Sequence, residues 1–478
     1  MSTLRSLRLL GAVEAGTVTG SQLQTYLTDA GRASEFSALL SSRGQSRRMA
    51  GSPTTMSAIV ASPVALDIVF KSATSVTSAA CSAVVVSPIA MSSVANNAAS
   101  LQVVGANPVS WSLFNTSTYY EANVRTIIAY LAGLTPATYP TLDSLISSSI
   151  SMGDIAATPY AVSAVVASAP ATTLVAANAA AMAMVASNPI SIDLVAKQTS
   201  IMSIIANSTI AMTEIVSRNS ATTKMATYPG AITAISKSAT AWAAYLASLY
   251  FAANLPLALA NLIGVTPSSY PTLDSIIADS VALGKVASNT QAVQALASNS
   301  AAMSTLAASP NIGIILGSTT AMAVIGTNTT AMTSFLNASG AWAGLFASSV
   351  AKGYIVASTA LVNVISGNSS LITYLGGLAK TATATGIPDG VVGAFQAFSG
   401  VPAKLLILSA KEVGIAATFS PYKFGGSSMA GANAGALVSL TAASTLPHVA
   451  GYTGMTWDLQ GIGVTAATLP IINYVDMT

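Results

Sequence analysis

Apolar and polar positions follow one another along this chain with a period of ten residues. Between residues 158 and 247 the pattern runs nine times without a shift. Place one of each unit is Ser or Asn, and place two is Pro, Thr or Ala. Place four is Ala, place five is Met or Ile, place eight is Val or Ile, and place nine is Ala. Places three, six, seven and ten are variable. A fixed period of this kind is typical of stacked supersecondary units, so it predicts a repeat architecture.

The apolar places four, five, eight and nine predict short helices. Positions that are one and four residues apart lie on one side of an α-helix. Ser or Asn at place one is a good N-cap, and proline at place two suits the first helical position. Proline stands at place two in several units, at Pro53, Pro63, Pro88, Pro108, Pro159, Pro189 and Pro229 among others. We therefore expect one two-turn helix in each unit.

Fusion of the units into one long helix is disfavoured. Ten residues at about 100° each fall about 80° short of three full turns, so the apolar stripe would drift around the rod. The prolines would also remove hydrogen bonds. We expect short helices that reverse direction every ten residues and depend on their neighbours for stability. A β-solenoid is the alternative, because place eight is β-branched, but the apolar places do not alternate with a period of two.

Three arrays of these units follow a basic head at residues 1–51, which we expect to be helical. The first array (52–114) has an irregular stretch at 82–86, the second spans 158–247, and the third (288–347) contains one nine-residue step. In the first array, units begin at Ser52, Ser62, Ser72, Ser87, Asn97 and Asn107. In the third array, units begin at Asn289, Asn299, Ser309, Ser318, Asn328 and Ala338. The last units carry Trp111, Trp242 and Trp342 at place five, and we interpret these side chains as caps on the open ends of the arrays.

A longer period of 131 residues (242 − 111) overlies the short one. The stretch GLTP at 133–136 with YPTLDS at 139–144 recurs as GVTP at 264–267 with YPTLDS at 270–275. The segments 115–157 and 248–287 are therefore expected to be duplicate helical spacers. Asp143 and Asp274 fall in the first turns of helices capped by Thr141 and Thr272, where a carboxylate interacts well with the helix dipole. We expect a structural role for both.

The ten-residue spacing is lost after about residue 379. We expect a connecting region at 348–404 and a β-rich terminal domain at 405–478, with strands at 405–408, 413–419, 436–440 and 461–474. In that domain, Trp457, Tyr422 and Tyr452 are candidates for exposed contacts or for ordinary core residues. The predicted fold is mainly α, with solenoid-like arrays of short two-turn helices and a small mainly-β C-terminal domain.

Composition raises the question of a membrane protein. The chain is 52% hydrophobic and 7% charged, and its mean hydropathy is +0.64. However, Ser, Asn, Thr and Pro recur in every unit, so no window offers the roughly 20 unbroken apolar residues that a span needs. We predict no membrane span. We also expect no signal peptide, because the short apolar run at 9–13 leads directly into Glu14.

Positive charge is concentrated in the head. The first fifty residues hold the arginines Arg5, Arg8, Arg32, Arg43, Arg47 and Arg48 and only three acids, Glu14, Asp29 and Glu35. Such a head favours docking on an acidic protein surface or on nucleic acid, while a solvated helix face is the plainer interpretation. No interleaved aromatic residues or nucleic-acid module accompany the arginines, so nucleic acid is not an expected partner.

Residues suited to catalysis or metal binding are scarce. The single Cys81 and the single His448 leave no disulfide framework and no multi-histidine or thiolate metal site, and Cys81 is expected to be a small buried residue. His448 and Asp458 lack a Gly-x-Ser-x-Gly element for a hydrolase triad. The run GGSS at 425–428 lacks the lysine of a phosphate loop. We therefore predict no catalytic, cofactor-binding or metal-ligating residues, no cofactor, and no enzyme activity.

The head resembles the beginning of tailed-bacteriophage virion proteins. The likeness rests on LRLLGAVEAGTVTG at 7–20, LTDAGR at 27–32 and SRGQSRRMA at 42–50. Those proteins similarly lead into arrays of Ser-Pro-Thr-Ala-Met-type units, and the first array here opens with SPTTM at 52–56. The resemblance covers the head and the arrays. It implies a fibre or appendage component of the virion, attached by its head. Many phage fibres are trimers with β-structured shafts, and short helical units depart from that pattern.

These observations together favour a non-enzymatic structural protein of a bacteriophage particle. We expect a tail-fibre or a neck or tail appendage component, in which the head binds other virion proteins and the arrays form a rigid spacer. The terminal domain would bind a partner subunit or a host-surface receptor, and the chain would form a homo-oligomer. The alternatives are a capsid or collar decoration (cement) protein and a bacterial surface adhesin. A depolymerase is disfavoured because paired acids are scarce.

Overall fold

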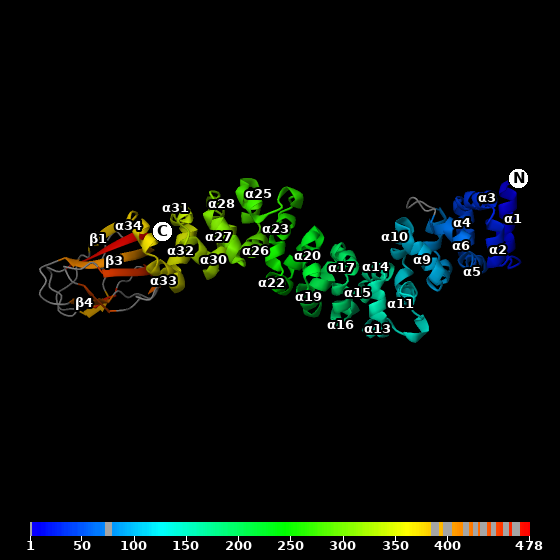
Figure 1. Ribbon diagram of the computed structural model, residues 1–478, viewed down its shortest axis with the longest axis horizontal. Coiled ribbons are helices and arrows are strands. Elements are labelled where there is room, and N and C mark those ends of the chain that lie inside the picture. Colours follow the sequence, from blue (N-terminus) through cyan, green and yellow to red (C-terminus); the bar gives the residue numbers. More distant parts are fainter. Residues whose placement is uncertain are drawn as a thin grey trace. The chain divides into compact units, whose positions relative to one another are not determined.

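The computed structural model is a succession of short α-helices followed by a small group of strands (Figure 1). It describes residues 2–71, 79–383, 392–394, 404–413, 420–423, 429–430, 437–440, 446–452, 458–460 and 469–478. The chain divides into two compact units, Met1–Asn254 and Leu255–Thr478, and each is described by itself. The predicted fold class is confirmed: the protein is mainly helical and solenoid-like, with a small mainly-β C-terminal part.

The first unit contains the head, the first two arrays and the first spacer. Its helices are α1 (Ser2–Glu14), α2 (Gly20–Leu27), α3 (Ala30–Leu40), α4 (Arg43–Gly51), α5 (Pro53–Val60), α6 (Pro63–Leu66), the π-helical turn η1 (Asp67–Lys71), α7 (Ala79–Val85), α8 (Pro88–Ala95), α9 (Ala98–Ala106), α10 (Pro108–Asn115), α11 (Tyr120–Leu131), the 3-10 turn η2 (Pro136–Thr138), α12 (Leu142–Ser147), α13 (Ser149–Ala157), α14 (Pro159–Val166), α15 (Ala169–Ala177), α16 (Ala179–Ser187), α17 (Pro189–Ala196), α18 (Thr199–Ala206), α19 (Thr209–Val216), α20 (Asn219–Thr227), α21 (Pro229–Lys237) and α22 (Ala239–Leu246).

The second unit contains the remaining helices and the strands. Helix α23 (Phe251–Leu262) crosses the boundary between the units. The helices that follow are the 3-10 turn η3 (Pro267–Ser269), α24 (Leu273–Ala278), α25 (Ser280–Ala287), α26 (Thr290–Ala297), α27 (Ser300–Ala308), α28 (Ile312–Leu316), α29 (Thr319–Ile325), α30 (Thr329–Leu336), α31 (Ser339–Ala347), α32 (Ser349–Ala357), α33 (Thr359–Gly367) and α34 (Ser369–Gly376). The strands are β1 (Lys380–Thr383), β2 (Val392–Ala394), β3 (Leu405–Val413), β4 (Ser420–Lys423), β5 (Met429–Ala430), β6 (Leu437–Leu440), β7 (Leu446–Tyr452), β8 (Asp458–Gln460) and β9 (Leu469–Asp476).

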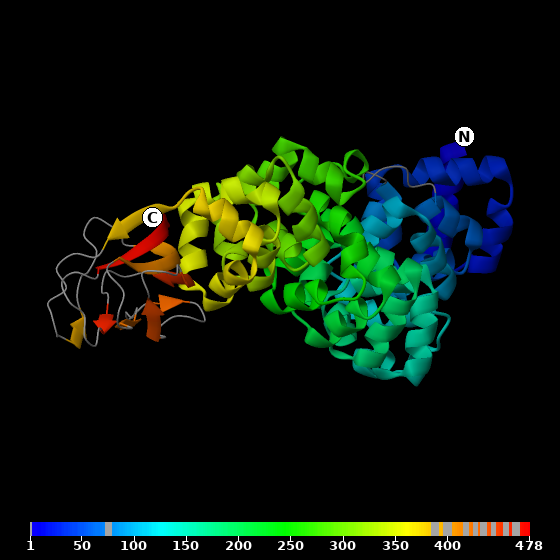
Figure 2. The same cartoon turned by 60° about the vertical axis from the view of Figure 1, so that its left-hand side comes forward.

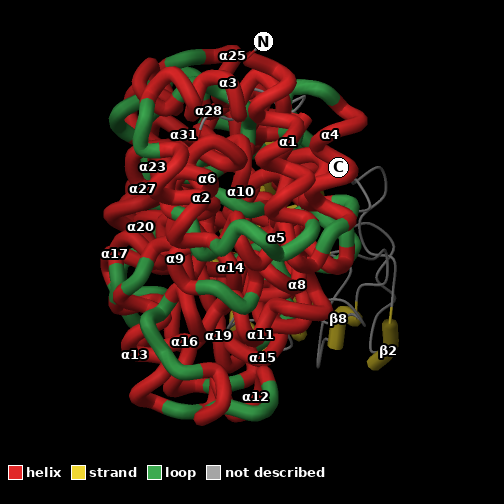
Figure 3. The backbone as a smooth tube through the Cα atoms, turned by 90° about the vertical axis from the view of Figure 1, so that its right-hand side faces the viewer, coloured by secondary structure: helices red, strands yellow, loops and turns green. Residues whose placement is uncertain are grey.

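Each ten-residue unit of the second array forms one helix, as the sequence predicts. Helices α14 to α22 all have their N-cap at place one, from Thr158 to Ser238. Places four, five and eight are buried in all nine units. The seven prolines named above each begin a helix, because a missing N–H costs nothing in the first turn. Pro310, at place two of the unit predicted at Ser309, does not. Figure 3 shows these helices as short segments joined by tight loops.

The expected reversal of direction at each unit is wrong. Consecutive helices turn by about 100°, for example by 103° between α14 and α15 and by 104° between α18 and α19. A helix therefore packs on the third helix after it: α14 on α17, α15 on α18, and α16 on α19. Three helices thus complete one turn of a solenoid. Small residues at place four, such as the fully buried Ala211, sit among these buried positions and leave room for close helix approach.

The side chain at place one joins successive turns of the solenoid. In the second unit, the Ser318 hydroxyl accepts a hydrogen bond from Ala321 N (3.2 Å) and donates one to Ala287 O (2.7 Å), at the end of α25. Asn328 does the same with its carboxamide, accepting from Ala331 N (3.0 Å) and donating to Ala297 O (3.1 Å). A helix start and the helix end one turn below are therefore satisfied together. Serine and asparagine suit place one because each has both a donor and an acceptor.

The head is helical, as expected, and it continues directly into the first array. Helix α2 packs on α5, which packs on α8, and α8 packs on α11. The units predicted at Ser52, Ser62, Ser87, Asn97 and Asn107 all have their N-cap there. The irregular stretch at 82–86 belongs largely to α7, and the unit predicted at Ser72 lies outside the described residues. Figure 2 shows the head helices in dark blue, next to the lighter blue helices of the first array.

The third array departs from the prediction at two points. Helix α28 begins at Ile312, after the N-cap Asn311, and not at the expected Ser309 unit; the Ser309 hydroxyl accepts from Asn311 N in the turn that precedes it. The repeat also continues after Trp342. Helices α32, α33 and α34 have N-caps at Ser348, Ser358 and Asn368, with unbroken spacing of ten, inside the range 348–404. Trp342 therefore does not end its array.

The strands close the last turns of the second unit. Five described strands form an antiparallel sheet in the order β1-β9-β3-β7-β5, and β2-β8 and β4-β6 form two further pairs. Helices α32 and α33 pack on β7 and β5, and α34 packs on β3. Residues 405–408 are all buried, although a strand normally alternates its faces. The sheet takes the place that a further turn of helices would fill.

The strands only partly match the prediction. Strand β3 begins at the expected Leu405 but runs on to Val413, so 405–408 and the start of 413–419 are one strand. Strand β6 confirms the segment 436–440, and β9 confirms the end of 461–474. The remaining parts of those segments lie outside the described residues. The sheet begins earlier than residue 405, because β1 pairs with β9 through Lys380 and Tyr474.

Candidate functional site

The arginine-rich head presents exposed positive charge on α1 and α4. Arg5, Arg8, Arg43 and Arg47 are exposed, and within the described part of the chain no ion pair joins them to a carboxylate. The other two arginines are engaged locally. The guanidinium of Arg48 pairs with the Glu14 carboxylate across α4 and α1, and that of Arg32 lies 4.7 Å from the centre of the Tyr26 ring.

Two of these arginines border a hollow between α4 and α7. The hollow has a volume of about 570 Å³ and is lined by Arg43, Arg47, Ser82 and the exposed Val86, among others. Arg43 and Arg47 are four residues apart and therefore project from the same side of α4. The hollow combines two guanidinium groups with hydroxyl and apolar surface, which suits an acidic side chain or peptide segment.

Charged side chains on the second array form links between turns. Asp193 on α17 accepts from Lys224 Nζ at 2.6 Å and from Tyr228 Oη at 2.7 Å, and pairs with Lys197 Nζ at 2.6 Å. Burial by itself would raise the pKa of Asp193, but these three donors more than offset it and hold that pKa well below its usual range. The hydrogen bond between Lys197 and Asp193 correspondingly raises the pKa of Lys197. This cluster has the character of a structural tie.

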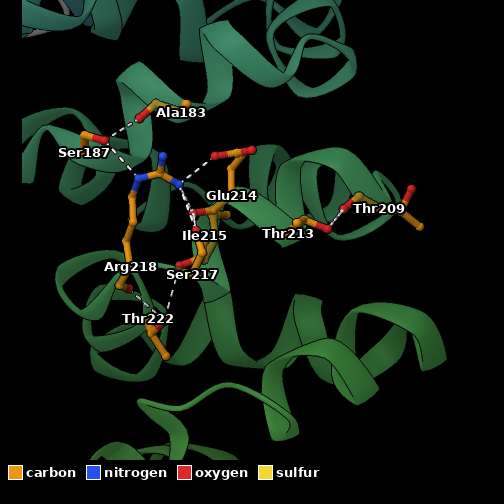
Figure 4. A network of polar contacts seen from close by, with 9 residues as sticks. All are labelled: Ala183, Ser187, Thr209, Thr213, Glu214, Ile215, Ser217, Arg218 and Thr222. Atoms are coloured by element: carbon orange, nitrogen blue, oxygen red, sulfur yellow. Dashed lines mark hydrogen bonds and ion pairs between the residues drawn. The ribbon is translucent and has the colours of Figure 1, made fainter.

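Arg218 shows how a unit without a small cap residue is joined to the turn below (Figure 4). It stands at place one of its unit, and its side chain makes no cap hydrogen bond. Its Nε instead donates to Ser187 Oγ on the previous turn (2.9 Å), while NH1 donates to Glu214 Oε2 (2.7 Å). Tyr228 also occupies place one and reaches the previous turn through Asp193. These polar contacts join neighbouring turns of the repeat.

The residues considered and rejected as a catalytic set lie on strands of which only the backbone is described. His448 lies in β7 and Asp458 in β8, which belong to different sheets, and nothing is described of their side chains. The run at 425–428 and Trp457 lie outside the described residues, and Tyr422 and Tyr452 are placed only as backbone in β4 and β7. Among the described residues, no group of three or more His, Cys, Asp or Glu side chains could hold a metal ion.

Cys81 is buried, and Asp143 and Asp274 stand in the first turns of capped helices, as expected. Cys81 is fully buried on α7, and burial raises the pKa of its thiol to about 11 although a hydrogen bond with Ser110 opposes the shift. Asp143 and Asp274 stand in the first turns of α12 and α24. There the predicted caps Thr141 and Thr272 form capping boxes with Ser144 and Ser275.

The three tryptophans at place five differ in exposure. Trp242 and Trp342 are buried, and Trp342 Nε1 donates to Leu336 O at 2.9 Å. Trp111 is only half-buried, although Phe114 and Tyr120 pack against its ring with centroid distances of 6.1 and 6.2 Å. Sequence reasoning treated the three as equivalent, because place five alone does not tell how much of the ring the neighbouring turns cover.

No protein-family model matches this chain, and a search of curated proteins finds no match. No single α-helix in the described residues is long and apolar enough to cross a membrane, whereas five bent helix pairs would pass the same test by length and composition.

Proposed function

We propose that this chain is a non-enzymatic structural protein of a tailed-bacteriophage particle, a tail-fibre or a neck or tail appendage component. The resemblance of residues 7–50 to virion proteins supports the location. The spacer role rests on one observation: place-one side chains such as Ser318, Asn328 and Ser348 hydrogen-bond one turn of the solenoid to the turn before it. A stack tied in this way resists bending, because opening one joint exposes two sets of unsatisfied backbone groups.

A solenoid of this kind gains little length for each residue it uses. One turn uses about thirty residues, and packed helices lie about 8–10 Å apart, so thirty residues add only that length along the axis. The same residues would add about 45 Å as a single α-helix. We therefore propose a stiff stub or strut, with the head on other virion proteins and the strands on a partner subunit or host-surface receptor. Homo-oligomers would multiply such struts around the particle.

The location is tested by immunogold labelling and quantitative mass spectrometry of purified particles. We expect the chain on the particle at a few to a few dozen copies. Hundreds of copies would favour a capsid or collar decoration protein, and recovery from the infected cytoplasm alone would eliminate the virion proposal.

The docking role of the head has its own test. Particles that lack the chain would be supplied with the variant Arg43→Glu/Arg47→Glu, which reverses the charge beside the α4–α7 hollow. We expect a loss of incorporation of at least about tenfold. Lys237→Glu, a reversal at an exposed position at the end of α21, is the matched control and should incorporate normally. Equal incorporation of both variants would show that the head arginines do not dock the chain.

A further inference from the structure

Beside Trp111 the solenoid has an open hollow of about 510 Å³, formed by α10, α14 and the α17–α18 connection. Its volume is in the range of small-molecule sites. The ring of Trp111 lines it together with Asn115, Thr116, Lys197, Gln198 and Ser200. An aromatic ring is thus set among amide and hydroxyl groups on a surface that is otherwise built from alanine, valine and serine.

Two side-chain amides of this hollow are available to a ligand. Within the described residues, the side-chain amides of Asn115 and Gln198 have no hydrogen-bond partner, and Gln198 makes no cap bond although it occupies place one. Each amide offers two donors and an acceptor. The one charged group, Lys197, is already paired with Asp193 at 2.6 Å. The hollow therefore offers hydrogen bonds but little net charge.

The second copy of the module shows that this set is not required by the fold. At the positions 131 residues later, Ser112, Asn115 and Thr116 are replaced by Ala243, Leu246 and Ala247. The equivalent Trp242 is 4% exposed, whereas Trp111 is half-buried. The same helix thus forms with apolar side chains at these positions. The polar side chains beside Trp111 are therefore not needed for folding.

We propose that this hollow binds an uncharged hexose oligosaccharide. A sugar ring has a face of C–H groups that packs on an indole, and a rim of hydroxyls that hydrogen-bonds to amides and hydroxyls. A nucleic-acid strand would also stack on Trp111, but its phosphates would need free cations, and the only lysine here is paired. The inference goes beyond the virion role and does not depend on it.

Binding is tested by saturation-transfer NMR and titration calorimetry on the full chain. The probes are tetrasaccharides of glucose, galactose, mannose and N-acetylglucosamine, each up to about 10 mM, with tetrathymidylate as the competing class. We expect a Kd of about 0.1–5 mM for at least one sugar series, as suits a single aromatic platform. Absence of binding by every sugar, or binding of tetrathymidylate alone, would overturn the proposal.

Three variants locate the site. Trp111→Ala should weaken sugar binding at least tenfold, and Gln198→Ala about threefold to tenfold. The triple variant Ser112→Ala/Asn115→Leu/Thr116→Ala installs the residues of the second copy, so it should fold normally and lose binding; it keeps the test decisive if Trp111→Ala fails to fold. Ser203→Ala, on the exposed side of α18, should bind as wild type. Undiminished binding by a folded triple variant or by Trp111→Ala would exclude this hollow as the site.

Discussion

The two copies of the 131-residue module keep their backbone devices and differ in the side chains around them. We compare 107–157 with 238–288. Gly133 and Gly264 both adopt the left-handed conformation (φ +75° and +65°) that stops a twelve-residue helix. Ser117 donates to Val85 O, and its counterpart Ser248 donates to Val216 O, which is itself 131 residues after Val85. The turn-to-turn hydrogen bond is therefore part of what the duplication retained.

Each copy has one phenylalanine and one tyrosine in its aromatic cluster, but the two residues exchange positions between the copies. In the first copy, Tyr120 is buried and donates to Ala164 O at 2.8 Å, beside Phe114. In the second copy, Tyr245 replaces the phenylalanine and Phe251 replaces the tyrosine. The Tyr245 hydroxyl is fully buried without a hydrogen-bond partner among the described residues, as is Trp242 Nε1. Both copies thus keep two aromatic rings at these positions, but the buried tyrosine hydroxyl is hydrogen-bonded only in the first copy.

The loop after the long helix is also anchored differently. In the first copy Arg125 NH1 donates to Pro136 O (2.6 Å) and to Tyr139 O (2.7 Å). The position equivalent to Arg125 is Pro256, inside α23, which has no donor to offer. There, Tyr270 Oη donates to Asp279 Oδ2 at 2.8 Å. The two copies therefore share the course of the loop backbone, but different side chains anchor the loop in each copy.

The largest effect should come from Arg125→Met, which removes the charged donor from two loop carbonyls. We expect a loss of about 2–3 kcal/mol in the free energy of unfolding, because hydrogen bonds to a charged group are strong and the carbonyls lose their partner. Urea denaturation followed by circular dichroism measures it. Arg125→Lys keeps a charged donor on a shorter side chain, so its stability should lie between that of wild type and that of the Met variant. A Met variant as stable as wild type would mean that the loop holds without this clamp.

The next effect should be equal in the two copies. Ser117→Asp and Ser248→Asp keep an acceptor for the N–H of Tyr119 or Tyr250 but place a carboxylate against a carbonyl oxygen. We expect each to cost about 2 kcal/mol, more than the corresponding alanine variants at about 1 kcal/mol. Asparagine, which retains a donor, should be closest to wild type. Aspartate variants that match serine in melting temperature would contradict the two-sided role of this position.

The local part of the fold was predictable from sequence. Helix starts follow from Ser or Asn followed by proline, and the buried places follow from the spacing of Ala, Met and Val, because caps and periodicity act within one unit. The angle between helices was not predictable in this way. The bend of about 100° and the packing of each helix on the third one after it depend on contacts between residues about thirty apart.

The two ends of the arrays show the same limit. Trp342 resembles Trp111 and Trp242 in its unit, yet Ser348, Ser358 and Asn368 start further helices after it. Lys380–Thr383 has no apolar alternation and becomes a strand only by pairing with β9.

The hollow at Trp111 was also missed, because the exposed fraction of a tryptophan depends on neighbouring turns. The replacement of Asn115 by Leu246 in the second copy was the available signal.

The hydroxyl exchange predicts opposite signs for one substitution in the two copies. Tyr120→Phe leaves the buried Ala164 O without its donor and should destabilise the chain by about 1–1.5 kcal/mol. Tyr245→Phe removes a buried hydroxyl that has no protein partner and should stabilise it by up to about 1 kcal/mol. Both are read from urea midpoints at pH 7.5. If Tyr245→Phe is the more destabilising change, a buried water or another group must satisfy that hydroxyl.

At alkaline pH, Tyr120→Phe and Tyr245→Phe should change the pH dependence of stability by the same amount. This is the smallest of the expected effects. Burial raises the pKa of Tyr120 well above its usual value, with a further contribution from the charge of Glu121, and burial raises the pKa of Tyr245 as well. The unfolded chain therefore loses these protons first, so stability is complete below about pH 10 and falls as the pH rises. At pH 10.5 each tyrosine that stays neutral in the fold accounts for about 0.8 kcal/mol of that fall. Each phenylalanine variant should lose that much less than wild type between pH 8.5 and 10.5 in urea titrations. A fall as steep as that of wild type in the Tyr245→Phe chain would show that Tyr245 ionises as readily folded as unfolded, and so that its ring is open to water.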